Sequence, residues 1–162
     1  MKNRIIKIVS VAVCCLLALG IMGCQNNDNG EKNIFAVEYN GVTVKLGAKA
    51  DSVLEKLGEP NDKQSSGNCG GLGETYIYSY PAFELTVVDY EDGDKIIDKI
   101  ELTTDSAETA DGIYIGAEKS AVTEAYGDGE ESNGALVYEE GDKKMAVGIK
   151  NGKVSYIIMY CD

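Results

Sequence analysis

Carboxylates, tyrosines and cysteines carry most of the chemistry available to this chain, because its 162 residues include no histidine. Without histidine, a Ser-His-Asp triad, a Cys-His pair and an HExxH zinc site all lack their central residue. No GxGxxG or GxxxxGK[ST] motif opens a helix to bind phosphate. The sequence therefore predicts a protein that is not an enzyme and that needs no cofactor.

The 27 acidic residues leave two interpretations open. Paired carboxylates are the catalytic groups of glycosidases, so a carboxylate-dependent hydrolase of envelope polymer is one of them. An acidic, solvated surface is the simpler one. Two acidic clusters, Asp89–Asp94 and Glu139–Asp142, offer oxygen ligands for weak calcium binding, but neither has the D-x-[DN]-x-[DN]-G spacing. We interpret both clusters as hairpin turns and predict no metal site.

The first 23 residues have the pattern of a cleaved export signal. Three basic residues within the first seven positions precede an apolar run, Ile8–Leu19, which is the order found in signal peptides. The run is shorter than the ~20 apolar residues that a membrane-spanning helix needs, and the polar residues 25–33 follow it closely. We expect residues 1–23 to be removed and residues 24–33 to form a flexible polar tether.

The segment Leu19–Cys24, LGIMGC, resembles the lipobox of bacterial lipoproteins. In that family a small residue, here Gly23, precedes a cysteine that is diacylated and becomes the first residue of the mature protein. Met22 departs from the pattern, which prefers a small residue there. The resemblance implies that a lipid on Cys24 anchors the chain on the extracytoplasmic face of a membrane, at the cell surface or in the periplasm, because two acyl chains give durable anchoring. An ordinary secretory signal with an incidental cysteine is the alternative.

Two cysteines are left after removal of the leader and lipidation of Cys24. Cys69 lies in the glycine-rich stretch 65–73, and Cys161 follows the last expected strand. Export favours their pairing because extracytoplasmic compartments are commonly oxidising. We predict a disulfide between Cys69 and Cys161, with two free thiols as the alternative. The absence of a CxxC motif argues against a redox-active pair.

The mature part of the chain is strongly acidic. The leader contains three of the 15 basic residues and none of the 27 acidic residues, which leaves 12 basic residues against 27 acidic ones and a net charge of −15. Such a surface repels phosphate backbones and anionic lipid headgroups. We therefore expect no nucleic acid partner, and attachment to the membrane through the lipid anchor.

The sequence contains an internal similarity. Val44–Pro60 aligns without gaps with Ile113–Gly129 at an offset of 69 residues, and two later blocks match in the same order at offsets of 60 and 57. The block at offset 60 pairs Tyr78 with Tyr138. Three blocks in one order favour duplication. We place repeat 1 at residues 34–110 and repeat 2 at residues 111–162, together forming one continuous domain.

Each copy has the pattern of a short helix followed by three strands. In the first copy, apolar residues at i, i+3, i+4 and i+7 spacing predict a helix over Lys49–Leu57, ended by Gly58. The predicted fold is α+β, with two tandem repeats that are each a short helix packed on a three-stranded antiparallel meander. The expected strands are 76–80, 83–90 and 95–103 in the first copy, 136–139, 143–150 and 153–160 in the second, and 34–39 before both.

This arrangement resembles the tandem-repeat fold of the β-lactamase inhibitor protein family (BLIP-like). The residues that carry the resemblance are an LGA or IGA turn before each helix and an LG or YG pair after it. A single copy resembles the small outer-membrane assembly lipoproteins of the BamE/SmpA type. The resemblance covers most of residues 42–160, and it implies that the helices cover one face of the sheet while the other face is a concave protein-binding surface.

Strand parity predicts which residues line such a surface. In the last strand, Ile157 and Met159 match core positions of the first copy, so Val154 and the residues at 156, 158 and 160 should face away from the helices. Three tyrosines of the strand at 76–80 also alternate onto a single face. Tyrosine suits binding surfaces because it offers a large rigid area and a hydroxyl, although core packing is the alternative for each one. The candidate protein-binding residues are Tyr76, Tyr78, Tyr80, Tyr156, Ile158 and Tyr160.

The function expected from these features is that of a membrane-anchored lipoprotein with a noncatalytic protein-binding domain. Its partner would be an envelope or extracellular protein that the sequence does not identify. Two alternatives stay open: an accessory subunit of an envelope assembly complex, and the carboxylate-dependent hydrolase.

Overall fold

The computed structural model describes residues 34–67, 73–91 and 93–162. The expected signal peptide, the lipidation site Cys24, the tether up to residue 33 and Cys69 lie outside the described residues. The described residues all belong to one unit of the chain, Lys32–Asp162. No helix within them is long and apolar enough to cross a membrane.

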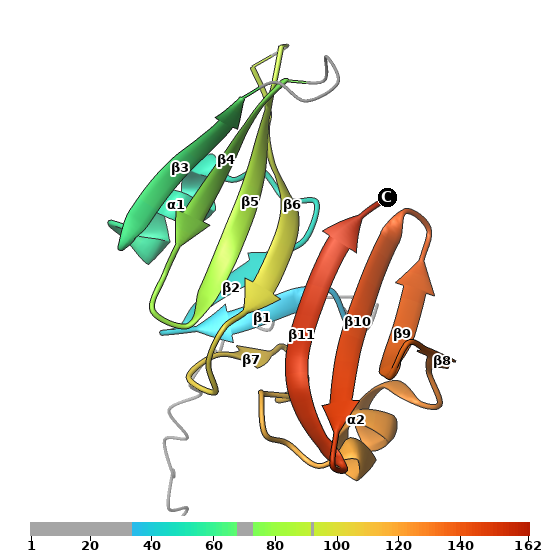
Figure 1. Cartoon of the computed structure of the whole chain (residues 1–162). Helices are drawn as coiled ribbons and strands as arrows, with labels where there is room; N and C mark the ends of the chain where they lie inside the picture. Colours follow the sequence, from blue (N-terminus) through green and yellow to red (C-terminus); the bar gives the residue numbers. More distant parts are fainter. Residues whose placement is uncertain (1–33, 68–72, 92) are drawn as a thin grey trace, which may run out of the picture. The chain divides into compact units, whose positions relative to one another are not determined.

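The larger sheet has eight antiparallel strands, which Figure 1 shows from β3 on the left to β8 on the right. Their order is β3-β4-β5-β6-β11-β10-β9-β8, so the sheet consists of two four-stranded meanders whose last strands, β6 and β11, pair with each other at its centre. The strands are β3 (Asp62–Gly67), β4 (Gly73–Ser79), β5 (Phe83–Tyr90), β6 (Lys95–Leu102), β8 (Glu130–Ser132), β9 (Ala135–Glu140), β10 (Lys143–Lys150) and β11 (Lys153–Cys161).

A second sheet has three antiparallel strands in the order β2-β1-β7. β1 (Ala36–Tyr39) and β2 (Val42–Lys45) form a hairpin, and β7 (Glu108–Thr109) pairs with the other edge of β1. The hairpin turn places Asn40 at φ 50° and Gly41 at φ 76°, the backbone that favours Asn-Gly in two-residue hairpins.

Two short helices precede the two meanders. α1 (Asp51–Leu57) leads into β3, and α2 (Lys119–Tyr126) leads into β8. Each helix ends at a glycine with positive φ, 76° at Gly58 and 81° at Gly127, whose N–H bonds back to a carbonyl of the last turn. Helices this short are not stable alone, so their apolar faces must pack on the sheets.

The predicted fold class is wrong. The described residues are mostly β, with one continuous eight-stranded antiparallel sheet and a separate three-stranded sheet, instead of two units that each pack a helix on a three-stranded meander. The expectation missed β3 and β8, because the polar residues of Asp62–Gly67 and Glu130–Ser132 show no apolar alternation. It also missed β2 and β7, and therefore the second sheet.

One hydrophobic core lies between the elements. Side chains from both sheets and from α2 belong to a single buried cluster, and partly buried apolar side chains of α1 pack against it. Within the cluster, Phe83 contacts the rings of Tyr39 from β1 and of Tyr80, which follows β4. Tyr126 of α2 contacts Tyr138 of β9 in the other half. The helices and the small sheet therefore lie on one side of the large sheet, which we call its core face, and we call the opposite side its outer face.

A β-bulge near the start of β11 changes which residues reach the core. Gly148 pairs with Tyr156 but Ile149 pairs with Val154, so Ser155 is an extra residue in the ladder. A bulge shifts the alternation of side chains by one. Val154 is accordingly buried on the core face, and the expectation that it faces away from the helices is wrong. The same irregularity occurs in β6, where Asp98 is the extra residue.

Candidate protein-binding face

The candidate site lies on β11, at the centre of the large sheet. Ile157 and Met159 are fully buried in the core, so the residues that alternate with them point to the outer face. Tyr156 is 37% exposed there, and Ile158 and Tyr160 are half-buried. We call these three residues the tyrosine patch, and their placement agrees with the sequence-based expectation.

The ring of Tyr156 lies over a glycine of the neighbouring strand. Gly148 of β10 is its direct cross-strand partner, and a Cβ atom added at Gly148 would come 2.1 Å from a carbon of the Tyr156 ring. No side chain fits there while the ring keeps its place. An aromatic ring that covers a strand glycine packs flat on the sheet, so the fold holds the exposed ring in a defined position.

Small and apolar neighbours extend the patch across β10 and β9. Ile158 pairs with Ala146, and Ala146 pairs with Val137. All three are half-buried, and together they form a row that continues the apolar surface away from β11. These neighbours carry only a weak signal in the sequence, which is the alternation of Lys144, Ala146 and Gly148 with core residues along β10.

Charged residues border the patch, and the two lysines among them are already paired. Lys99 contacts Glu101, with 2.7 Å between Nζ and Oε2. Lys144 contacts both Asp162 and Glu139, and these hydrogen bonds raise the pKa of its ammonium group, Asp162 first. The neighbouring lysines are therefore neutralised by carboxylates of the same chain.

The equivalent strand of the other half shows that the scaffold does not require this apolar surface. In each half, the turn before the helix and the central strand exchange two backbone hydrogen bonds, one in each direction. Gly47 N–H donates to Ile97 O in β6, and Gly116 N–H donates to Val154 O in β11, both at 2.8 Å. The N–H groups of Ile97 and Val154 donate back to the turns. Since both bulges follow these hydrogen-bonded residues, Lys99 occupies in β6 the place of Tyr156 in β11.

The same equivalence extends to the next outward position. Glu101 of β6 pairs with Glu84, whereas Ile158 of β11 pairs with Ala146. Charged side chains are thus accepted on the outer face of a central strand in this fold. The sheet therefore does not require an apolar residue at these outward positions.

The other predicted tyrosines lie on the opposite face. Tyr78 is 8% exposed and Tyr80 is 6% exposed, and both belong to the core. The Tyr80 hydroxyl donates to the carbonyl of Gly58 at 3.2 Å, which satisfies its polar end, and burial raises the pKa of this hydroxyl. The six predicted residues therefore do not form one surface, because parity predicts alternation without identifying the core face.

Tyr76 occupies an intermediate place on that core face. It is half-buried beside the ring of Tyr78, and Lys63 Nζ lies 4.4 Å from the centre of its ring. Its hydroxyl donates to Glu74 at 2.7 Å, and this bond to a carboxylate raises the pKa of Tyr76 to about 12. Tyr76 is thus held by its own neighbours and is separated from the tyrosine patch by the thickness of the sheet.

The hydrogen bonds of two tyrosine hydroxyls correct the sequence alignment of the two repeats. Tyr138 donates to the carbonyl of Gly127 at 3.1 Å, as Tyr80 does to that of Gly58. The structural counterpart of Tyr138 is therefore Tyr80, instead of the Tyr78 that the offset of 60 predicts.

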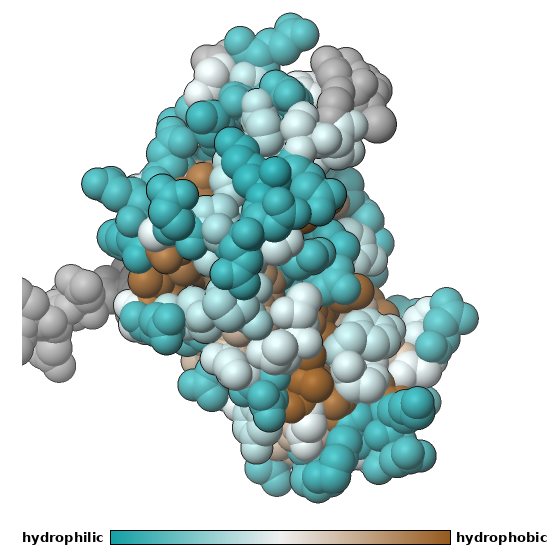
Figure 2. All heavy atoms as spheres, turned by 60° about the vertical axis from the view of Figure 1, so that its left-hand side comes forward, coloured by the Kyte–Doolittle hydropathy of each residue, from teal (hydrophilic) through white to brown (hydrophobic). Residues whose placement is uncertain are grey.

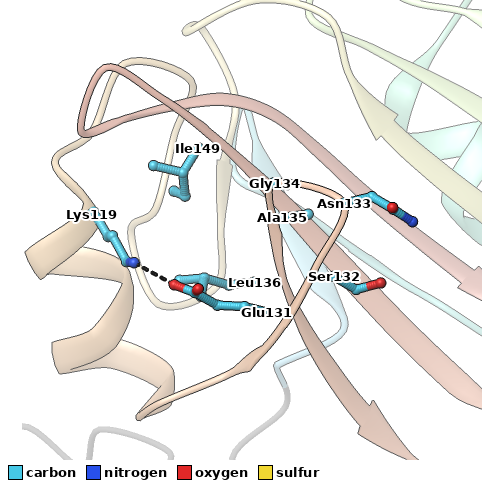
Figure 3. A pocket seen from close by; sticks show the side chains of 8 residues that line it. All are labelled: Lys119, Glu131, Ser132, Asn133, Gly134, Ala135, Leu136 and Ile149. Carbon is cyan, nitrogen blue, oxygen red and sulfur yellow. Dashed lines mark hydrogen bonds and ion pairs between the residues drawn. The ribbon is translucent and has the colours of Figure 1, made fainter.

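A shallow hollow of about 440 Å³ lies beside the edge strand β8, and Figure 3 shows its lining. Lys119 of α2 and Glu131 of β8 face each other across it at 2.8 Å, and the Lys119 hydrogen bond lowers the pKa of Glu131. This ion pair ties the edge strand to the helix. Both side chains are well exposed, so the pair adds little stability.

Cys161 ends β11 and is half-buried. Burial, followed by the nearby charge of Asp98, raises the pKa of its thiol. It forms no disulfide with any described residue. Cys161 and Gly73 line the same hollow of about 800 Å³, and Cys69 precedes Gly73 by four residues, a chain length that spans at most ~14 Å. The predicted disulfide to Cys69 stays a prediction.

Hydrophilic side chains cover most of the surface visible in Figure 2, with smaller hydrophobic areas between them. Within residues 34–67, 73–91 and 93–162, no group of three cysteines or carboxylates is arranged to hold a metal ion.

No family model matches the chain, and no curated protein or solved structure matches it either.

Proposed function

We propose that this chain is a membrane-anchored extracytoplasmic lipoprotein that binds another protein through the tyrosine patch. The observation that carries the proposal is the difference between the two central strands. Equivalent outward positions hold Lys99 and Glu101 in β6 but Tyr156 and Ile158 in β11. An apolar surface that the fold does not need is a common mark of a binding site.

The patch also has the rigidity that favours binding. β11 is hydrogen-bonded on both sides, to β6 and to β10, so its backbone does not have to become ordered when a partner docks. The ring of Tyr156 is packed on Gly148. A preorganised aromatic side chain loses little entropy on binding, which is one reason that tyrosine is frequent among residues that dominate interface energies.

The anchor is proposed from the leader and from Cys24. An acidic domain is repelled by anionic headgroups, so the lipid would hold the domain near a membrane while the patch stays available to a protein. Because a thioether forms only on a cysteine thiol, Cys24→Ser should release the protein from the membrane fraction or leave it uncleaved. A wild-type protein whose intact mass lacks a diacylglycerol would contradict the anchor.

Site-specific photocrosslinking in cells tests the binding proposal. We expect a photoreactive amino acid at Tyr156 of the full-length protein to give one prominent crosslinked product. Tyr114 is the matched control, because it is 44% exposed but lies outside the tyrosine patch. Equal crosslinking from both positions, or none from Tyr156, would contradict a binding face on β11. If nearly every copy of the protein were crosslinked to the same partner, the result would favour the accessory-subunit role.

A further inference from the structure

Two carboxylates face each other directly beside the tyrosine patch. Glu84 of β5 and Glu101 of β6 are cross-strand partners on the outer face, and like charges in that arrangement destabilise a sheet. Glu101 is partly compensated by Lys99. Glu84 is exposed and accepts a hydrogen bond from the Ser79 hydroxyl at 3.2 Å, but none of the ion pairs among the described residues includes it.

The carboxylate pair continues the row of the patch. Glu101 pairs on its other side with Ile158, which pairs in turn with Ala146. A row across four strands therefore runs from two carboxylates to two apolar side chains. Arginine and lysine match such a row, because their methylene stems cover apolar surface while their charged heads reach acidic groups. Arginine can also bond carboxylates with two N–H groups at once.

Charge distinguishes between the possible occupants. The chain carries 27 acidic residues against 15 basic ones, so a second copy would bring the same negative charge to the face. An anionic lipid surface would be repelled for the same reason. Lys99 and Lys144 are already engaged by carboxylates of the chain and do not offset the unpaired Glu84. The electrostatics favour a cationic occupant.

We propose that the outer face receives a cationic segment of a partner protein, whose arginine or lysine lies against Glu84 and Glu101 while apolar side chains of the segment contact the tyrosine patch. This inference rests on the proposed function and adds the chemistry of the partner to it. The carboxylate pair determines the sign of the partner's charge, and the patch provides the apolar contact.

A labelled hexa-arginine peptide is a defined probe of the carboxylate pair. The full-length protein in neutral detergent should bind it, and Glu84→Gln with Glu101→Gln should weaken binding roughly tenfold, as loss of close charge pairs at an interface does. The matched control is Glu38→Gln with Glu108→Gln, because Glu38 and Glu108 are directly opposed across β1 and β7 and the variant loses the same charge. We expect less than a twofold change in that control.

Equal weakening in the two variants, or no binding of the peptide at low salt, would overturn the inference. Thermal unfolding of both variants checks that each is folded. Photocrosslinking at Tyr156 in the Glu84→Gln, Glu101→Gln background separates this inference from the proposed function. Loss of the crosslinked product supports the cationic occupant. Undiminished crosslinking would support the binding face but refute the role of the carboxylates. A product of twice the chain's own mass would identify a second copy as the occupant, which would also refute the cationic segment.

Discussion

In the half of the large sheet formed by β3 to β6, the central strand presents Lys99 and Glu101 on the outer face; in the half formed by β8 to β11, it presents Tyr156 and Ile158. The core positions between them are alike, with Ile100 in one strand and Ile157 in the other, both fully buried. The inward residues thus follow the demands of packing. The outward residues differ because packing of the core does not constrain them, so they are the positions at which a binding function can arise.

The largest effect is expected from the core positions that the two halves share. Ile100→Ala and Ile157→Ala should each lower the free energy of unfolding by ~2–5 kcal/mol, because each leaves a cavity in a packed core. Urea unfolding monitored by circular dichroism measures both. A large loss for one variant and almost none for the other would show that the two halves are not equivalent in packing.

The predicted disulfide between Cys69 and Cys161 would join the two halves covalently. If Cys69 and Cys161 pair, Cys161→Ser should lower the melting temperature, since a disulfide typically contributes ~2–4 kcal/mol by constraining the unfolded chain. Nonreducing peptide mapping of protein recovered from the envelope should show the linked peptides. Quantitative alkylation of both cysteines without reductant would show that no disulfide joins the halves.

A smaller effect is expected at Gly148 of β10, whose equivalent in the other half is Thr86 of β5. Gly148→Ala should destabilise the fold by ~1–3 kcal/mol, because overpacking displaces a neighbouring group, here the Tyr156 ring that a Cβ atom would meet at 2.1 Å. Thr86 holds the corresponding place opposite Lys99. Thr86→Ala should change stability less, and adding Tyr156→Ser to Gly148→Ala should recover part of the loss. If that second substitution recovers nothing, the ring does not pack on Gly148.

Several elements of this structure could be predicted from the sequence. The helix ending at Leu57 and the alternation of Phe83, Leu85 and Val87 follow from local periodicity, and these three side chains are fully buried. Local patterns failed at Val154 because a bulge shifts parity without a marker in the sequence. They also failed for the pairing of β6 with β11, since strand order depends on contacts between residues that are distant in the chain.

The candidate site was predictable only in part, for the same reasons. The outward direction of Tyr156, Ile158 and Tyr160 followed from parity within β11. Parity cannot say which face of β4 meets the core, so Tyr78 and Tyr80 were assigned to a binding surface although they are buried. Gly148 and Glu84 became relevant only through their cross-strand partners.

A double substitution in β11 gives the most direct test: Tyr156→Lys with Ile158→Gln makes its outward positions polar, as in β6, without placing a third carboxylate beside Glu101, the cross-strand partner of Ile158. Because β6 carries Lys99 and Glu101 at the equivalent places, the variant should keep its free energy of unfolding within ~1 kcal/mol, as surface substitutions commonly do. A photoreactive residue at Tyr160 reports on binding in cells. We expect a folded protein whose crosslinked product is lost. A folded variant that crosslinks as strongly as the wild-type sequence would contradict the proposed binding face.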